Sequence, residues 1–376
     1  MNILGTNIIS SLGFTTAENF VAVKQGISGI KHYDIGTFDL PEAFMGSLIN
    51  KEKLNDEFLT YSSKNKVNDF SILEKAAILS IISANKEATI DLSNERTLFI
   101  LSTTKGNVDS LKENNGNRKF LWRTAEIIID YFGNKTPPMI VSNACISGAA
   151  AQIDAMRVLQ SGKYDDVVVV GVDFLSKFIV SGFQSLKAMS PIQCKPFDKE
   201  RSGLNLGEAA ATIIFSKFSK EDTKGVRLIA GAIRNDSNHI SAPSRTGEGS
   251  FRALRNILQN IIIDEISFVN AHGTATPYND AMEAVAITRA GLENVPVNSL
   301  KAYFGHTLGA AGVLESIISM RALEEKMVLK SLNFTEQEFD NPLKIPMENQ
   351  KSDKKYFVKT LSGLGGVNVA LLFLRG

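Results

Sequence analysis

A cysteine followed by small residues is the feature of this chain that most directly suggests chemistry. Cys145 lies between the apolar segment 138–142 and a run that begins at Gly148, which predicts a strand that gives way to a helix. At such a junction a thiol meets the positive end of the helix dipole and unpaired backbone N–H groups. We expect these groups to lower the pKa of the thiol below about 8.5 and to stabilise an oxyanion beside it. The pattern therefore predicts a nucleophile that forms a thioester.

The same pattern recurs later in the chain, which argues against an inert buried cysteine. His306 is followed three residues later by Gly309-Ala310-Ala311, just as Cys145 is followed by Gly148-Ala149-Ala150. The apolar segment 295–299 precedes this second copy and predicts a second strand. The two copies predict that a cysteine and a histidine reach one site from equivalent junctions.

A further echo follows each copy of the pattern. Ser-Gly-Leu occurs at 202–204 and again at 362–364, each time before a strand-like segment. The separation between copies is nearly constant, which favours a duplication over a solenoid of many short repeats. We expect an N-terminal half, 1–225, that carries the nucleophile and a C-terminal half, 226–376, with the polar run 217–225 as the seam.

The composition is that of a globular α/β protein. The 376 residues are 44% hydrophobic and 22% charged, and apolar strands alternate with helical patterns. Segments 97–102 and 166–171 lack polar alternation, which predicts buried parallel strands, and 71–86 predicts an amphipathic helix. A formal net charge of +1 gives no reason to expect nucleic acid or an anionic membrane as a partner.

The same composition bears on the compartment. No apolar run approaches the roughly 20 residues of a membrane span. The first residues lack the pattern of a signal peptide, and two cysteines cannot form a disulfide framework. We expect a cytoplasmic protein.

A second histidine completes the candidate site. Segment 268–270 is strand-like, His272 begins a loop, and Asp280 and Glu283 follow on an expected helix. His272 and His306 thus both lie at strand ends in glycine-containing surroundings. A metal site is the alternative, but their spacing is not that of helical ligands and no cysteine pair accompanies them. We expect no metal.

Four ordered motifs together resemble those of a β-ketoacyl-acyl carrier protein synthase, an elongating type II ketosynthase among the thiolase-fold condensing enzymes. The motifs are Asn143–Gly148, Asn270–Thr276, Lys301 with Gly305-His306, and Gly363–Asn368. The resemblance covers nearly the whole chain. It implies a thiolase-like, five-layered α-β-α-β-α fold built from two similar halves, which agrees with the duplication described above.

The resemblance also implies a mechanism. Cys145 would accept the acyl chain as a thioester, and the backbone N–H groups of Cys145 and Ser362 would form the oxyanion hole. His272 and His306 would bind the thioester carbonyl of malonyl-acyl carrier protein and stabilise the enolate that forms when carbon dioxide leaves. The enolate would then attack the acyl group and give 3-oxoacyl-acyl carrier protein.

Supporting roles follow from the same resemblance. Lys301, with Glu315, would maintain the orientation of the histidines and the local charge. Asp280 and Glu283 would brace the His272 loop rather than perform chemistry.

The resemblance implies an acyl carrier protein as partner. Its phosphopantetheine arm, held by Thr274 and Thr276, would be the substrate carrier, and no permanently bound cofactor is expected. Lys64 and Lys66 are candidates for a basic surface that docks the acidic carrier. The chain would form a homodimer, or a heterodimer with a ketosynthase-like subunit.

One departure from the family pattern bears on function. Elongating synthases usually carry a bulky phenylalanine where this chain has Ser362, so we expect a more open pocket. Because such a pocket could take stiffer chains, polyene or polyketide assembly competes with fatty-acid elongation as the function.

The alternative function is a non-catalytic, chain-length-determining subunit of a heterodimer. Such subunits typically lose the nucleophile, whereas Cys145 and both histidines are present here. Cys194 lies in a polar loop and is not expected to be a second catalytic thiol.

Overall fold

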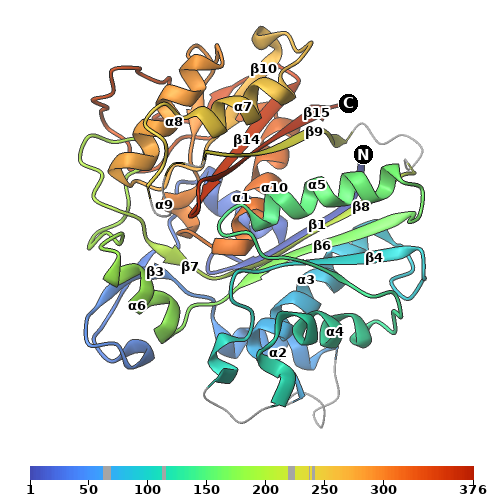
Figure 1. Cartoon of the computed structure of the whole chain (residues 1–376). Helices are drawn as coiled ribbons and strands as arrows, with labels where there is room; N and C mark the ends of the chain where they lie inside the picture. The colour runs from blue at the N-terminus through green and yellow to red at the C-terminus, as the bar shows by residue number, and fades with distance from the viewer. Residues whose placement is uncertain (62–68, 112–115, 219–224, 237, 239–241) are drawn as a thin grey trace.

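Figure 1 shows the computed structural model, which describes residues 1–61, 69–111, 116–218, 225–236, 238 and 242–376. Ten strands form its main sheet, in the order β11-β10-β14-β15-β9-β1-β8-β6-β4-β5. The strands from the first part of the chain are β1 (Asn2–Ser10), β4 (Thr97–Ser102), β5 (Met139–Val141), β6 (Asp166–Asp173) and β8 (Ala209–Ser216). Those from the second part are β9 (Val226–Asn235), β10 (Ile266–Asn270), β11 (Val297–Asn298), β14 (Tyr356–Gly363) and β15 (Val367–Arg375).

The two sets of five strands have the same topology. From the middle of the sheet outward, one set runs β1, β8, β6, β4, β5 and the other runs β9, β15, β14, β10, β11. In each set the two inner pairings are antiparallel and the two outer pairings are parallel. The sets are joined where Asn2 of β1 pairs with Arg227 of β9. This repeated topology confirms the predicted duplication.

Helices form three layers around the two strand sets (Figure 1). The outer layer on β1, β6 and β8 contains α3 (Ile72–Ala88) and α4 (Leu121–Tyr131), with α2 (Lys51–Leu59) beside them. The central layer contains α1 (Thr16–Lys24), α5 (Ser147–Gln160) and α10 (Ala311–Glu324). The other outer layer contains α7 (Glu248–Ile257) and α8 (Pro277–Arg289). The expected α-β-α-β-α order is therefore confirmed.

Smaller elements surround the ends of the sheet. These are α6 (Lys177–Ser185), α9 (Lys301–Phe304), a sheet of β2 (Lys31–Tyr33), β3 (Phe44–Ser47) and β7 (Leu206–Gly207), and a pair of β12 (Met327–Val328) and β13 (Gln350–Lys351). None of the described helices combines the length and the apolar character needed to cross a membrane.

Two glycines let the central helices touch near their amino-terminal ends. A Cβ on Gly148 of α5 would lie 2.8 Å from the carbonyl oxygen of Gly309. A Cβ on Gly312 of α10 would lie 2.7 Å from the carbonyl carbon of Gly148. Gln152 links the helices further, since its amide donates to the carbonyls of both Gly148 (3.1 Å) and Gly312 (3.0 Å). Because each helix follows a candidate catalytic loop, this contact brings the two loops together.

Most predicted elements form where local sequence specifies them. The helix expected at 71–86 is α3, whose Ser71 accepts the N–H of Glu74 while the Glu74 carboxylate accepts the N–H of Ser71. The segment 97–102 is β4, parallel to both neighbours, whereas 166–171 belongs to β6, which is parallel to β4 but antiparallel to β8. The prediction of a buried parallel strand therefore holds for β6 on the side of β4 only, because the chain returns antiparallel on the other side as β8.

The segments 295–299 and 217–225 were expected to be a strand and a seam between the halves. Only Val297 and Asn298 of the segment 295–299 pair in the sheet, so this predicted strand is much shorter than expected. Of the polar run 217–225 expected as a seam, residues 219–224 lie outside the described residues.

Candidate active site

A sharp turn between β5 and α5 presents the Cys145 thiol. Ala144 has a φ of +46°, a left-handed conformation that reverses the chain direction just before the cysteine. Ser147 stabilises this turn, because its hydroxyl accepts the N–H of Asn143 (2.8 Å) and donates to the carbonyl of Ala144 (2.6 Å). Helix α5 begins at Ser147, so Cys145 lies just before the helix, as the sequence predicted.

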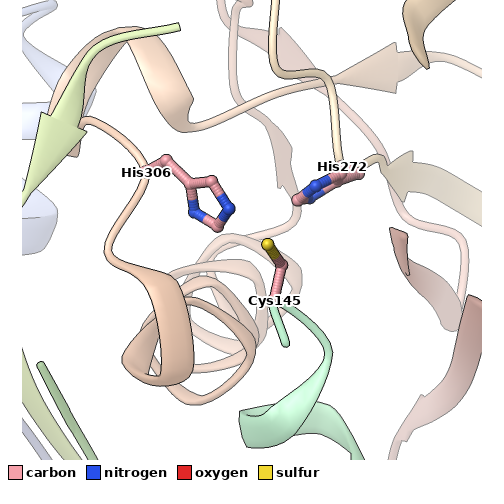
Figure 2. A group of neighbouring side chains, drawn as sticks. All are labelled: Cys145, His272 and His306. Carbon is pink, nitrogen blue, oxygen red and sulfur yellow. The ribbon is translucent and has the colours of Figure 1, made fainter. Parts of the chain in front are cut away.

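Both histidines lie next to this thiol (Figure 2). The Cys145 sulfur and one ring nitrogen from each of His272 and His306 all lie within 4.8 Å of one another. The imidazole centroids are 5.2 Å apart and the rings are nearly perpendicular, at 84°. His272 follows β10 and His306 lies between α9 and α10, so the three groups come from both parts of the duplicated chain.

Burial reverses the predicted pKa shift of the nucleophile. Removal from water raises the pKa of the Cys145 thiol to about 11, although the Lys301 ammonium and the backbone N–H of Leu364 act to lower it. The expectation of a lowered pKa is therefore wrong, because desolvation of the thiolate outweighs the nearby positive charges. The thiol is protonated near neutral pH and must give up its proton as it attacks.

Both imidazoles of the cluster are neutral, and His306 is oriented as a hydrogen-bond donor. Burial, followed by the charge of Lys301, lowers the pKa of both His272 and His306 well below its usual value, so both rings are neutral near pH 7. His306 Nδ1 accepts the N–H of Leu308 at 3.2 Å, which places the ring proton on Nε2. His306 Nε2 is buried and has no hydrogen-bond partner among the described residues. It is thus available to donate to a bound substrate.

Two carboxylates of α8 hold the backbone of the His272 loop. Glu283 accepts the N–H groups of His272 (2.8 Å) and Gly273 (2.7 Å). Asp280 accepts the N–H of Thr274 at 3.0 Å. Because Asp280 and Glu283 are buried and bind backbone, their contacts agree with a bracing role.

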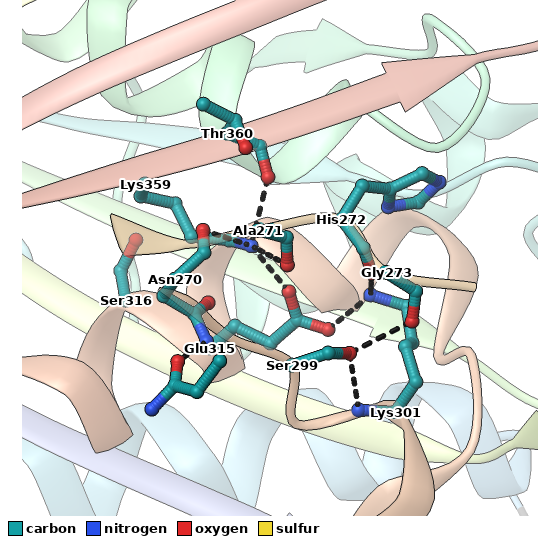
Figure 3. A network of polar contacts seen from close by, with 12 residues as sticks. Asn270, Ala271, His272, Gly273, Ser299, Lys301, Glu315, Ser316, Lys359 and Thr360 are labelled. Atoms are coloured by element: carbon teal, nitrogen blue, oxygen red, sulfur yellow. Dashed lines mark hydrogen bonds and ion pairs between the residues drawn. The ribbon is translucent and has the colours of Figure 1, made fainter. Parts of the chain in front are cut away.

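A buried cluster of three charged side chains lies behind His272 (Figure 3). Lys301 donates to the carbonyl of His272 at 3.1 Å and to Oε1 of Glu315. Glu315 Oε2 lies 2.6 Å from the ammonium of Lys359, and all three side chains are buried. Sequence reasoning anticipated Lys301 and Glu315 but missed Lys359. The available signal was a lysine inside an otherwise uncharged strand, β14.

The thiol and two imidazoles also have the chemistry of metal ligands. Their donor atoms are close enough to bind one ion. The neighbouring ammonium groups of Lys301 and Lys359 disfavour a cation at this position. The cluster is therefore better suited to stabilising a developing negative charge.

The comparisons with known proteins agree with this geometry. Residues 91–220 match the model of the beta-ketoacyl synthase N-terminal domain, and residues 227–335 match that of the C-terminal domain. The chain belongs to the beta-ketoacyl synthase family. It is 25% identical over 418 residues to a 3-oxoacyl-[acyl-carrier-protein] synthase 2 of Vibrio cholerae, with 99% of this chain and 98% of the relative covered.

Two solved structures have a similar fold. One is a beta-ketoacyl synthase from Burkholderia phymatum, with a TM-score of 0.87, 24% identity and coverage of 100% of this chain and 98% of that one. The other is a ketosynthase in complex with its chain length factor from Xenorhabdus doucetiae, with a TM-score of 0.85, 23% identity and coverage of 100% and 97%.

The catalytic cluster of this beta-ketoacyl synthase opens into a pocket of about 460 Å³. Cys145 and both histidines line it, as do Thr274 and Thr276, whose hydroxyls lie 2.9 Å apart. The two threonines thus line the same pocket as the thiol and both imidazoles.

The glycine-rich turn after β14 forms another wall of the pocket. Ser362 lines it and donates its hydroxyl to Oδ1 of Asn368 at 2.8 Å. The backbone N–H of Leu364, two residues later, acts to lower the pKa of the Cys145 thiol, and Leu364 is 46% exposed. Sequence reasoning missed Leu364, although it lies in the motif 363–368. The oxyanion role of Ser362 stays a prediction.

Proposed function

We propose that this chain catalyses the decarboxylative Claisen condensation of an acyl thioester with malonyl-acyl carrier protein, giving 3-oxoacyl-acyl carrier protein. The observation that carries the proposal is the convergence of Cys145, His272 and His306 at one pocket. The relative named 3-oxoacyl-[acyl-carrier-protein] synthase 2 supports the class of substrate.

The first half-reaction loads the nucleophile. Cys145 Sγ attacks the acyl carbonyl while its proton passes to a neutral imidazole of the cluster. The oxyanion that forms accepts the backbone N–H groups of Cys145 and Ser362, with the N–H of Leu364 close to the same thiol. Collapse of this intermediate breaks the bond to the pantetheine sulfur, which leaves with the proton, and the acyl chain stays on Cys145.

The second half-reaction forms the carbon–carbon bond. The thioester carbonyl of malonyl-acyl carrier protein accepts hydrogen bonds from His272 and from His306 Nε2. As carbon dioxide leaves, the electron pair of the broken bond forms an enolate, which these donors stabilise. The enolate carbon attacks the acyl carbonyl on Cys145, and the sulfur leaves as a thiolate, which takes up a proton from solvent. Lys301 and Glu315 hold the His272 loop, and the charge of Lys301 helps to keep both imidazoles neutral.

The proposal extends to partners and pathway. The phosphopantetheine arm of an acyl carrier protein would pass Thr274 and Thr276, and no resident cofactor is required. The docking candidates Lys64 and Lys66 lie outside the described residues. The functional unit would be a homodimer or a heterodimer with a ketosynthase-like subunit, in the cytoplasm. The small Ser362 favours polyene or polyketide assembly as an alternative to fatty-acid elongation.

The non-catalytic alternative is less well supported. A chain-length-determining subunit does not require a thiol and two neutral imidazoles within 4.8 Å of one another. Maintaining such a buried cluster is expected of a chain that performs the chemistry.

A two-step mass-spectrometric assay tests the proposal. The protein is incubated with an acyl-carrier protein and then with malonyl-carrier protein, and the acylated residue and the 3-oxoacyl product are identified. We expect acylation of Cys145, release of carbon dioxide and product. Cys145→Ala should abolish the product, and Cys194→Ala serves as the matched control. Absence of both acylation and decarboxylation in the unchanged protein would contradict the proposal.

A further inference from the structure

Three successive backbone carbonyls at the start of the His272 loop are bound by buried ammonium groups (Figure 3). Lys359 Nζ lies 3.3 Å from the carbonyl oxygens of Asn270 and of Ala271. Lys301 Nζ lies 3.1 Å from that of His272. Strand pairing places Lys359 directly opposite Asn270, the last residue of β10. The strand end that carries His272 is therefore clamped by two lysines.

The clamp places two positive charges and one negative charge in the protein interior. Both lysine side chains are 0% exposed, and each contacts a different oxygen of Glu315. Lys359 has one further acceptor, the carbonyl of Thr360 at 2.9 Å. Burying an ammonium group is costly, and a pair of Lys301 with Glu315 alone would be neutral. The second lysine therefore calls for an explanation other than charge balance.

We propose that Lys359 is a positioning residue for the condensation, which fixes the strand end bearing His272 and supplies, with Lys301, a second buried positive charge beside the two imidazoles. This inference rests on the proposed function. Lys359 acts on the decarboxylation half-reaction, because that step uses both imidazoles as neutral donors. Acyl transfer to Cys145 depends on it less, because one neutral imidazole is enough to receive the thiol proton.

The charges around the imidazoles support this role. After burial and Lys301, Lys359 is a further cause of the lowered pKa of both His272 and His306. The other ionisable groups that face Lys359 are Glu315 on α10 and Glu283 on α8. Burial lowers the pKa of Lys359 itself to about 8, with Glu315 acting in the opposite direction.

The charge of Lys359 determines the direction in which the pH dependence of decarboxylation moves. Below about pH 8 the ammonium of Lys359 is present and opposes protonation of the imidazoles. Removing the charge of Lys359 raises the pKa of both imidazoles. The acid limb of the pH–rate profile for decarboxylation therefore moves to higher pH.

Two substitutions separate the charge of Lys359 from its hydrogen bonds. Lys359→Gln keeps amide donors near the carbonyls but removes the charge, and Lys359→Met removes both. Lys355→Met is the matched control, because Lys355 lies just before β14 with a side chain that is 62% exposed. The imidazole titrations are followed by NMR on histidine-labelled protein, which is practical because the chain has four histidines. The two half-reactions are measured over the same pH range.

We expect both Lys359 variants to raise the titration midpoints of His272 and His306 towards the ordinary value of about 6.5. The acid limb of decarboxylation should move up by the same amount, while acyl transfer below pH 8 changes by no more than about threefold. Only Lys359→Met should also lower the maximal decarboxylation rate, because it alone releases the carbonyls. Lys355→Met should match the unchanged protein.

Two outcomes would overturn the inference. One is unchanged imidazole midpoints in both variants; the other is an equal fall of both half-reactions with an unshifted pH profile, which would make Lys359 merely structural. If neither variant folds, the inference is tested by the NMR titration of the unchanged protein. A titration midpoint near about 6.5 for His272 or His306 in that protein would refute the inference. Failure of the proposed function is seen separately, because the titration requires no substrate.

Discussion

Replacing Gly312 with alanine should weaken both the stability and the activity of this chain. The new Cβ would lie 2.7 Å from the carbonyl carbon of Gly148 and closer still to the backbone nitrogen of Ala149. These are backbone atoms of α5, so no rotamer change relieves the overlap. Alanine gains up to about 1 kcal/mol over glycine in a helix, whereas overpacking a core costs about 1–3 kcal/mol. With the overlap on backbone, we expect the free energy of unfolding to fall by about 1–2 kcal/mol.

The effect on catalysis should be larger. The Cys145 turn leads into α5 and the His306 loop leads into α10, so separating these helices moves the thiol away from the imidazole. A displacement of about 1 Å can reduce a rate by about 100-fold. We therefore expect 3-oxoacyl-acyl carrier protein formation to fall by about 10- to 100-fold.

Chemical denaturation and product formation measure the two effects. Gly182→Ala in α6 is the matched control, because a Cβ there would meet no atom within 4 Å. It should retain full activity and be as stable as the unchanged protein or slightly more so. If Gly312→Ala unfolds at the same denaturant concentration and works at the parent rate, the close contact between α5 and α10 is refuted.

Three further predictions concern the site itself. Iodoacetamide should modify Cys145 before Cys194, because burial raises the pKa of Cys145 to about 11 and that of Cys194 to about 12. The rate of Cys145 alkylation should rise about tenfold per pH unit between about pH 7 and 10, as the thiolate fraction grows. Peptide mapping that finds Cys194 alone modified, with activity lost, would contradict the assignment. His272→Ala and His306→Ala should each slow malonyl decarboxylation by about 100-fold or more, because the enolate requires both donors, but should leave acyl transfer measurable. A variant that releases carbon dioxide at the parent rate would refute the role of that histidine in stabilising the enolate. Ser362→Phe should reduce acylation by rigid polyunsaturated donors more than by short saturated ones in a competition assay, and an unchanged preference would place pocket selection elsewhere.

Local residue patterns determined the elements and the identity of the reacting groups. The capping pair Ser71 and Glu74 starts α3 within one residue of the prediction, because a helix start depends on neighbouring side chains and backbone. The duplication was visible because both junctions repeat Gly-Ala-Ala, and Gly148 of the first run packs against the backbone of Gly309 in the second. Cys145 and the two histidines were identifiable because each lies in a motif whose chemistry is local.

Only the tertiary structure decided the electrostatics of the site and its supporting groups. The sequence predicted a lowered pKa for Cys145 from its helix, but packing buries the thiol and raises that pKa instead. Lys359 reaches the His272 loop only because β14 pairs with β10, and Leu364 acts on the thiol only because Gly363, which ends β14, packs against the Cys145 turn. Burial and charge depend on residues far apart in the chain, so spacing along the sequence does not contain them.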